Sequence, residues 1–170
     1  FYIDGVYTII DMATAYGTSL GLNTTGLLLA LLLTQIVAFP ASLTFAVLSK
    51  TKDTASLIKV AIIAYFLIAL FAVQLDKQWE FWVLAVAVGC FQGGIQALSR
   101  SYFAKIIPEN ASGEYFGLFD ICGKGASFLG TMLIGVVTQI TGKQNLGVAA
   151  LSIMFVIGYL IFNKVSKMDD

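Results

Sequence analysis

The residues of this chain that are able to do chemistry are ionisable groups set inside very apolar sequence. The segment YFGLFDICGKGASFLG, residues 115–130, contains an acid, Asp120, and a base, Lys124, four positions apart. On a helix this spacing brings the two side chains to one face, one turn apart. Such groups can bind a polar solute, carry a proton or form a static pair that fixes helix packing, and the choice depends on whether the segment lies in water or in lipid.

Other polar residues recur at helical spacing within apolar sequence. They are Asp4, Asp11, Gln35, Gln92, Gln96 and Arg100. The two aspartates are seven positions apart, and the last three residues follow one another at intervals of four, so each set shares one helix face. These faces are candidates for a pathway taken by a substrate or a proton.

Metal and enzyme chemistry have little support in the sequence. There is no histidine, which removes the commonest metal ligand and the commonest general base. Cys90 and Cys122 lie in apolar runs, and we interpret them as small buried hydrophobes, with a disulfide as the alternative. Intramembrane aspartyl proteases pair a YD helix with a GxGD helix, but this chain has YID and GLFD, with Lys124 one turn from Asp120. We therefore expect no enzyme activity, no metal and no cofactor.

The composition is that of a membrane protein. Hydrophobic residues make up 58% of the 170 residues and charged residues 12%, against about 45–50% and about 25% in soluble domains. The mean hydropathy is +0.87. The formal net charge is zero and there is no basic block, so a nucleic-acid partner is not expected.

Six apolar runs separated by short polar connectors predict an all-α polytopic membrane protein with six transmembrane helices. We expect them at about residues 1–20, 25–48, 57–75, 79–104, 114–140 and 146–163, within one unit that spans residues 1–170. A helix needs about 20 residues to cross the hydrocarbon core. Barrel strands are shorter than these runs, and only helices and closed barrels are viable in lipid.

Basic residues predict the orientation of the helices. One set of helix ends carries Lys50, Lys52, Lys59, Arg100, Lys105, Lys164 and Lys167. The opposite set carries only Lys77 and Lys143, and Trp79 and Trp82 would mark the interface on that side. By the positive-inside rule the first set is cytoplasmic. We expect an integral protein of the bacterial cytoplasmic membrane with both chain ends in the cytoplasm.

The polar residues also predict which helices line a cavity. A charge at the bilayer centre costs about 2.5–3.5 kcal/mol on insertion scales, so it faces a bundle interior or a water-filled space. Helices one, four and five carry the charges and should line that space, with helix two beside it. Helices three and six are almost wholly apolar and should face lipid. This order predicts two three-helix repeats, the plan of each half of a major facilitator transporter.

Depth and small residues complete this hypothesis. At about 1.5 Å per residue, Asp11 and Lys124 each lie about 15 Å along their helices, which would be near mid-depth. We therefore expect Asp11, Asp120 and Lys124 to form one cluster of charges, the alternative being a static Asp120–Lys124 pair. Glycine pairs spaced GxxxG, at 17 and 21 and at 89 and 93, are interpreted as close helix contacts.

One stretch of sequence is similar to a known family. GGIQALSRSYFAKIIPENASGEYFGLFDICGK (Gly93–Lys124) resembles the autophagy-related vacuolar effluxer-like branch of the major facilitator superfamily. The match runs through GG-x-QALSRSYFA-x-x-IP and then SGE-x-FGL-x-D-x-x-GK. YIDGVYTIIDMA (Tyr2–Ala13) resembles the opening of the seventh helix in these proteins.

The resemblance implies that the chain forms helices seven to twelve, the C-terminal half of a twelve-helix exporter of small metabolites. Amino acids are the suggested cargo of this family. The residues carried over by position are Asp4, Asp11, Gln92, Gln96, Ser99, Arg100, Glu114, Asp120 and Lys124. A lone half cannot enclose a cavity, so the implied partners are membrane lipid, a small-molecule substrate, and either an N-terminal half or a second copy of this chain.

The leading hypothesis is therefore half of a secondary active transporter that works by alternating access, with proton coupling through Asp11 or Asp120. The alternative is a non-transporting membrane module that forms a homodimer through its cavity face or its glycine faces. A channel is a weaker possibility because nothing resembles a selectivity filter.

Overall fold

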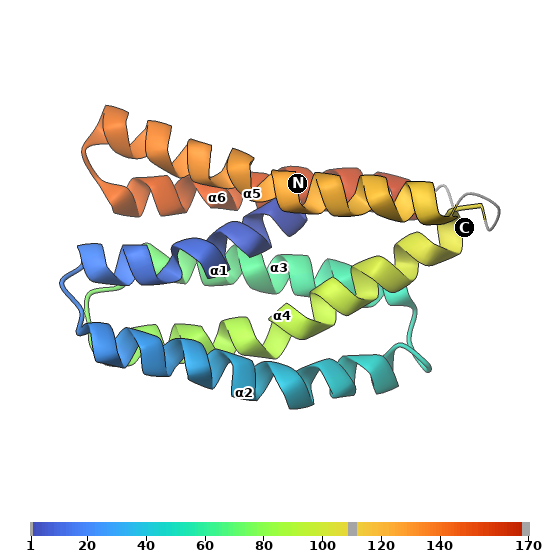
Figure 1. The fold of residues 1–170 in the computed structure, drawn as a ribbon, viewed down its shortest axis with the longest axis horizontal. Coiled ribbons are helices and arrows are strands. Elements are labelled where there is room, and N and C mark those ends of the chain that lie inside the picture. Colours follow the sequence, from blue (N-terminus) through green and yellow to red (C-terminus); the bar gives the residue numbers. More distant parts are fainter. Residues whose placement is uncertain (1, 109–111, 168–170) are drawn as a thin grey trace.

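The computed structural model describes residues 2–108 and 112–167, and within 122–127 only the backbone. This part of the chain is helical (Figure 1). The helices are α1 (Tyr2–Ser19), α2 (Thr24–Leu48), α3 (Thr54–Ala72), α4 (Gln78–Ile106), α5 (Ser112–Thr141) and α6 (Gln144–Ser166). The bounds differ from the expected ones by at most three residues.

Four of these helices, α2, α3, α4 and α6, are long and apolar enough to cross a membrane, within the part of the chain described. Phe128–Thr141, the second half of α5, is a shorter apolar helix. Asp4 and Asp11 lie in α1, and Glu114, Asp120 and Lys124 lie in the first half of α5. The all-α polytopic membrane fold is thereby confirmed.

A side-chain cap explains why α3 begins earlier than its hydrophobicity predicts. Asp53 accepts hydrogen bonds from the backbone N–H groups of Ala55 and Ser56, at 3.3 and 2.8 Å. These bonds satisfy donors that the first turn of a helix leaves without partners. The third helix therefore begins at Thr54, three residues before the apolar run at Leu57.

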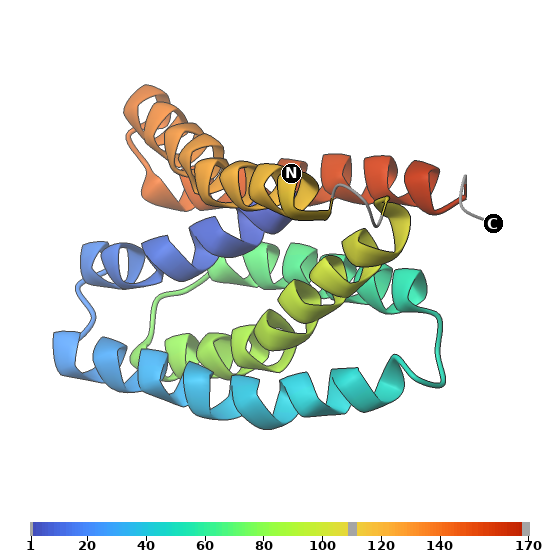
Figure 2. The same ribbon diagram turned by 45° about the vertical axis from the view of Figure 1, so that its right-hand side comes forward.

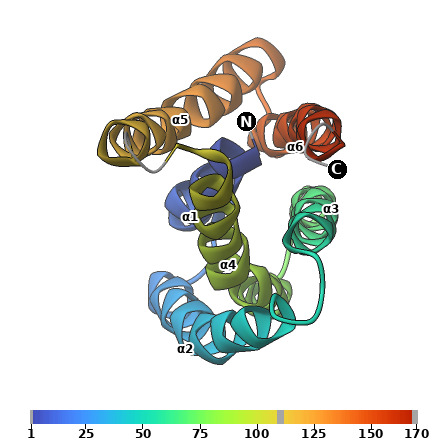
Figure 3. The same cartoon turned by 90° about the vertical axis from the view of Figure 1, so that its right-hand side faces the viewer.

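The helices pack as two interleaved groups of three. Figure 3 shows α4 in the middle of the bundle with α1 beside it, α2 and α5 at opposite corners, and α3 next to α6. The main contacts join α2 to α4, α5 to α1, α3 to α4, α6 to α1, and α3 to α6. If α1, α2 and α3 are exchanged for α4, α5 and α6, each of these contacts becomes a contact of the same set. Two three-helix repeats would have this symmetry. The exception is that α5 also packs on α6, whereas α2 and α3 scarcely touch.

The expectation that α3 and α6 face lipid stays a prediction, because each helix also exposes apolar side chains, such as Leu67 of α3 and Leu160 of α6. Half of the most apolar window of each helix is buried, against 22% for α2. An apolar surface all round suits a helix packed between others as well as one in lipid. The most exposed apolar side chains of α2 recur every three or four residues, so they share one helix face: Leu28, Leu32, Ile36, Phe39, Leu43 and Val47.

Close packing at glycine is confirmed for one of the two expected pairs. A Cβ atom on Gly89 would lie 2.7 Å from the Thr34 carbonyl oxygen, and one on Gly93 would lie 2.8 Å from Ser42 Cβ. These glycines therefore let α4 approach the backbone of α2. Gly21 instead follows the end of α1 with a φ of +74° and has no neighbour within 4 Å.

Candidate functional site

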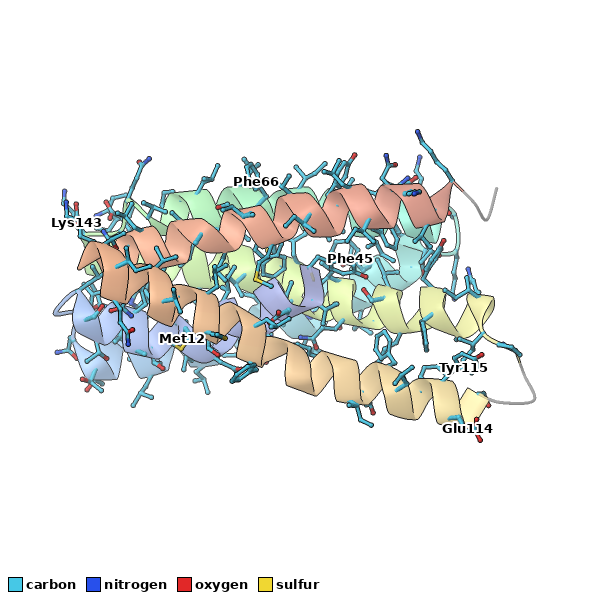
Figure 4. The ribbon with its side chains drawn as sticks, turned by 90° about the horizontal axis from the view of Figure 1, so that it is seen from above. Met12, Phe45, Phe66, Glu114, Tyr115 and Lys143 are labelled. Carbon is cyan, nitrogen blue, oxygen red and sulfur yellow. The ribbon has the colours of Figure 1, made fainter. Side chains whose placement is uncertain are left out.

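The described part of α1 starts at Tyr2, about halfway along the bundle, which changes the expected depth of its acids. Figure 1 shows the N-terminus near the middle of the molecule, and Figure 4 shows Lys143 at one end of the molecule and Glu114 at the other. We call these the Lys143 end and the Glu114 end. The hydroxyl groups of Tyr2 and Ser99 are 2.9 Å apart, which ties the start of α1 to the interior of α4. Expected depths counted from a membrane surface at residue 1 are therefore wrong for α1.

Asp4 takes the mid-depth position that we expected for Asp11. Its carboxylate contacts Gly130, which lies eleven residues before the end of α5 at Thr141. That is about 16 Å at 1.5 Å per residue, or half of a hydrocarbon core of about 30 Å. Asp11 lies seven residues, about 10 Å, farther toward the Lys143 end and is exposed.

Asp4 joins α1 to α5 in the core of the bundle. It is 1% exposed, and its Oδ1 accepts a hydrogen bond from the Gly130 backbone N–H at 3.2 Å and a long one from the Thr8 hydroxyl at 3.5 Å. The second oxygen, Oδ2, is buried and has no hydrogen-bond partner. Gly130 packs directly against Thr8, where any Cβ would collide. Asp4 and Asp11 thus share a helix face without sharing an environment.

A second polar contact joins α4 to α5 near the Glu114 end. Arg100 Nη2 lies 3.0 Å from Asp120 Oδ1, and the two side chains are 57% and 46% exposed. Arg100 is 22 residues from the start of α4 at Gln78, about 33 Å along the helix. The ion pair therefore lies at the edge of the hydrocarbon core. The sequence suggested Lys124 as the partner of Asp120, but the Lys124 side chain lies outside the described residues, as does that of Cys122.

The expected cluster of Asp11, Asp120 and Lys124 does not form one site in the part of the structure described. Asp120 lies ten residues, about 15 Å, from Gly130 toward the Glu114 end. Asp11 lies on the opposite side of mid-depth. The two acids are therefore separated along the bundle, with the Asp4 joint between them.

The three predicted glutamines lie on α2 and α4. Gln35 is exposed at the middle of α2, and Gln92 and Gln96 are half-buried on α4. The Oε1 atom of Gln92 is buried and has no hydrogen-bond partner. A buried amide oxygen that has no protein partner is a ready acceptor for water or a solute.

Aromatic residues at the Glu114 end were missed by the sequence reasoning. Phe103 of α4 packs on Phe116 and Phe119 of α5, with ring centroids 5.6 and 4.7 Å apart. Phe103 and Phe119 also line a cavity of about 200 Å³, together with Tyr2 and Phe162. The phenylalanines at 116 and 119, three positions apart on α5, were the available signal.

Comparison with known proteins places the chain in a family. The model of the family described as vacuole effluxer Atg22 like matches residues 1–168. The chain belongs to this family. The resemblance that the sequence motifs suggested is confirmed.

The chain is 45% identical over 161 residues to an uncharacterized MFS-type transporter, YxiO, of Bacillus subtilis, which covers 95% of this chain and 38% of that protein. It is 34% identical over 95 residues to autophagy-related protein 22 of Eremothecium gossypii, covering 56% of this chain and 19% of that protein. The chain thus spans well under half the length of these relatives. No solved structure matches it.

Proposed function

We propose that this chain is the C-terminal half of a major facilitator secondary transporter that moves small polar metabolites by alternating access. The exposed Arg100–Asp120 pair is the observation that carries this proposal. Two charged side chains at the edge of a lipid-embedded bundle need a wet surface or a polar partner. A cavity closed by a second six-helix half supplies both, and the name and length of the Bacillus subtilis relative support such a half.

The position of the pair suggests its role. It bridges α4 and α5 at the Glu114 end, which the distribution of basic residues predicts to be cytoplasmic. Next to it, Phe103 packs on the aromatic side chains of α5. We place the passage for the solute toward mid-depth, beside Gln35, Gln92 and Gln96, and the ion pair at its cytoplasmic mouth. The mixture of amide groups and both charges suits zwitterions, so amino acids are the proposed cargo. The proposed role is transport, with no enzyme reaction.

Transport is tested with the full-length protein in proteoliposomes. Uptake of a panel of radiolabelled amino acids is measured with and without a pH gradient, for wild type, Arg100→Gln and Arg100→Lys. We expect gradient-driven uptake of at least one amino acid, at least a tenfold loss in Arg100→Gln, and partial activity in Arg100→Lys, which keeps the charge.

Lys143→Gln is the matched control, because Lys143 is an exposed cation at the opposite end of the bundle. It should transport as wild type does. Absence of uptake for every amino acid would refute the proposed cargo, and equal loss in Lys143→Gln would refute a specific role for Arg100.

The alternative, a membrane module that forms homodimers without transporting, is favoured by one observation. The exposed face of α2 carries large apolar side chains, with Phe39 70% and Ile36 61% exposed. The mass of the purified chain in detergent decides between a monomer and a dimer. A dimer that dissociates on Ile36→Lys would favour this alternative.

A further inference from the structure

We propose that the Asp4 carboxyl is a proton-binding site, and that the proton it takes up loosens the joint between α1 and α5. The proton site is independent of cargo. Its role in driving transport rests on the function proposed above.

Only one of the two oxygens of the buried Asp4 carboxylate has hydrogen-bond partners. One oxygen accepts the Gly130 N–H and the Thr8 hydroxyl, while Oδ2 is buried without a partner. A buried carboxylate is costly unless it is paired and fully hydrogen-bonded. A proton on Oδ2 removes the charge and leaves Oδ1 as an acceptor, so both protonation states fit the same pocket.

None of the cations on the neighbouring helices forms an ion pair with Asp4 among the described residues. The titratable or charged groups on α1 and on the helices that contact it are Tyr2, Tyr7, Asp11 and Tyr16 of α1, Lys59 and Tyr65 of α3, Glu80, Cys90, Arg100, Tyr102 and Lys105 of α4, Glu114, Tyr115, Asp120, Cys122 and Lys124 of α5, and Tyr159 and Lys164 of α6. Arg100 already pairs with Asp120. The side chain of Lys124 and the amino group of Phe1 lie outside the described residues.

The hydrogen bond to Gly130 connects the proton to the shape of α5. An unbroken helix directs each backbone N–H at the carbonyl four residues earlier, and a side chain that competes for such a donor is a known cause of bending. Figures 2 and 4 show α5 changing direction near its middle. An ionised carboxylate is the stronger acceptor, so protonation weakens the contact with Gly130 and lets α5 straighten or move away from α1.

Asp4 protonation is measured directly on the full-length protein in nanodiscs, without any substrate. The infrared C=O band of protonated carboxyl groups is titrated between pH 4 and pH 9 for wild type, Asp4→Asn and Asp11→Asn, in roughly half-unit steps across the carboxyl range. Hydrogen exchange of the peptide containing Gly130 is followed over the same pH series. We expect a titrating band in wild type and Asp11→Asn that is missing from the Asp4→Asn spectrum. We also expect wild type and Asp11→Asn, but not Asp4→Asn, to lose protection at Gly130 at low pH, with protection taken relative to the intrinsic exchange rate at each pH.

A second variant keeps the proposal testable if Asp4→Asn does not fold. Thr8→Val removes one hydrogen-bond donor to the ionised carboxylate and keeps the side-chain shape, so it should move the titration midpoint to higher pH. Survival of the band and of the pH-dependent exchange in Asp4→Asn, or an unmoved midpoint in Thr8→Val, would overturn the proposal. Because no substrate is used, a failure of the transport proposal leaves this result unchanged.

Discussion

Removing the hydroxyl group of Tyr16 and removing that of Tyr65 should change the stability of the bundle in opposite directions. Tyr16 is 4% exposed, and its hydroxyl donates a 2.8 Å hydrogen bond to the carbonyl of Ala72, the last residue of α3. Tyr65 is fully buried and stacks on Phe155 at 5.8 Å between ring centroids. Its hydroxyl has no hydrogen-bond partner in the described structure.

The magnitudes follow from these two environments. Tyr16→Phe loses one hydrogen bond, about 0.5–1.5 kcal/mol of net stability, and membrane helix–helix bonds lie near the lower value. The Ala72 carbonyl then keeps only a long bond from the Leu75 N–H, at 3.4 Å, among those described. Tyr65→Phe removes a buried hydroxyl whose unpaired state costs about 1–3 kcal/mol. The rings stay in place, so the two variants should differ by about 1.5–4.5 kcal/mol.

Unfolding of the full-length protein by a denaturing detergent gives the free energies, with Tyr7→Phe as the control. Tyr7 is half-buried and enters none of the hydrogen bonds described, so its variant should stay within about 0.5 kcal/mol of wild type. A Tyr65→Phe variant that is less stable than wild type would refute the reasoning, because its hydroxyl must then have a partner.

Two other substitutions test close packing and capping. Gly89→Ala should lower the stability by about 1–3 kcal/mol, since its Cβ would meet the Thr34 carbonyl, whereas Gly135→Ala in α5, with no neighbour within 4 Å, should not. Asp53→Ala should cost about 1 kcal/mol and Asp53→Asn much less. The Ser56 N–H lowers the pKa of Asp53, so its stabilisation is present above the unfolded pKa of about 3.9 and is lost as the pH falls through the folded value. Denaturation between pH 7 and pH 3 should show this loss in wild type and not in Asp53→Asn, roughly over the carboxyl range.

The helices could be predicted because the thickness of the membrane fixes the length of an apolar run. Their exact ends could not, because Asp53 begins α3 by a local hydrogen bond that hydropathy does not register. The close contact at Gly89 was also predictable, since small residues four positions apart form one ridge on a helix.

Contacts between helices were harder to predict. Sequence spacing identifies neighbours on one helix, such as Asp120 and Lys124, but not the rotation that brings Arg100 of α4 to Asp120. Asp4 and Asp11 share a face, yet only Asp4 is covered by α5. Figure 1 shows the Lys143 end of α5 well apart from the corresponding end of α1. The angle between two helices therefore decides which residues of one helix face are buried. The spacing of residues in the sequence does not determine this angle.

Two polar contacts, Asp4 with Gly130 and Arg100 with Asp120, join other helices to α5, and this predicts that they are coupled. Asp4 contacts α5 at Gly130, and Arg100 contacts it at Asp120, about 15 Å away along one continuous helix. If this stretch of α5 moves as a rigid rod, a change at one contact shifts the other. Unfolding free energies of Asp4→Asn, Arg100→Gln and the double variant then deviate from additivity by about 0.5–2 kcal/mol.

Independent segments of α5 would instead give additive effects, because separated sites without shared partners add to within about 0.5 kcal/mol. The cycle is measured at a pH where Asp4 is ionised and again where it is protonated. A coupling that disappears on protonation would show that the hydrogen bond to Gly130 transmits it. Additivity at both pH values would refute the rigid connection and leave the mid-depth joint and the Glu114 end as separate features of α5.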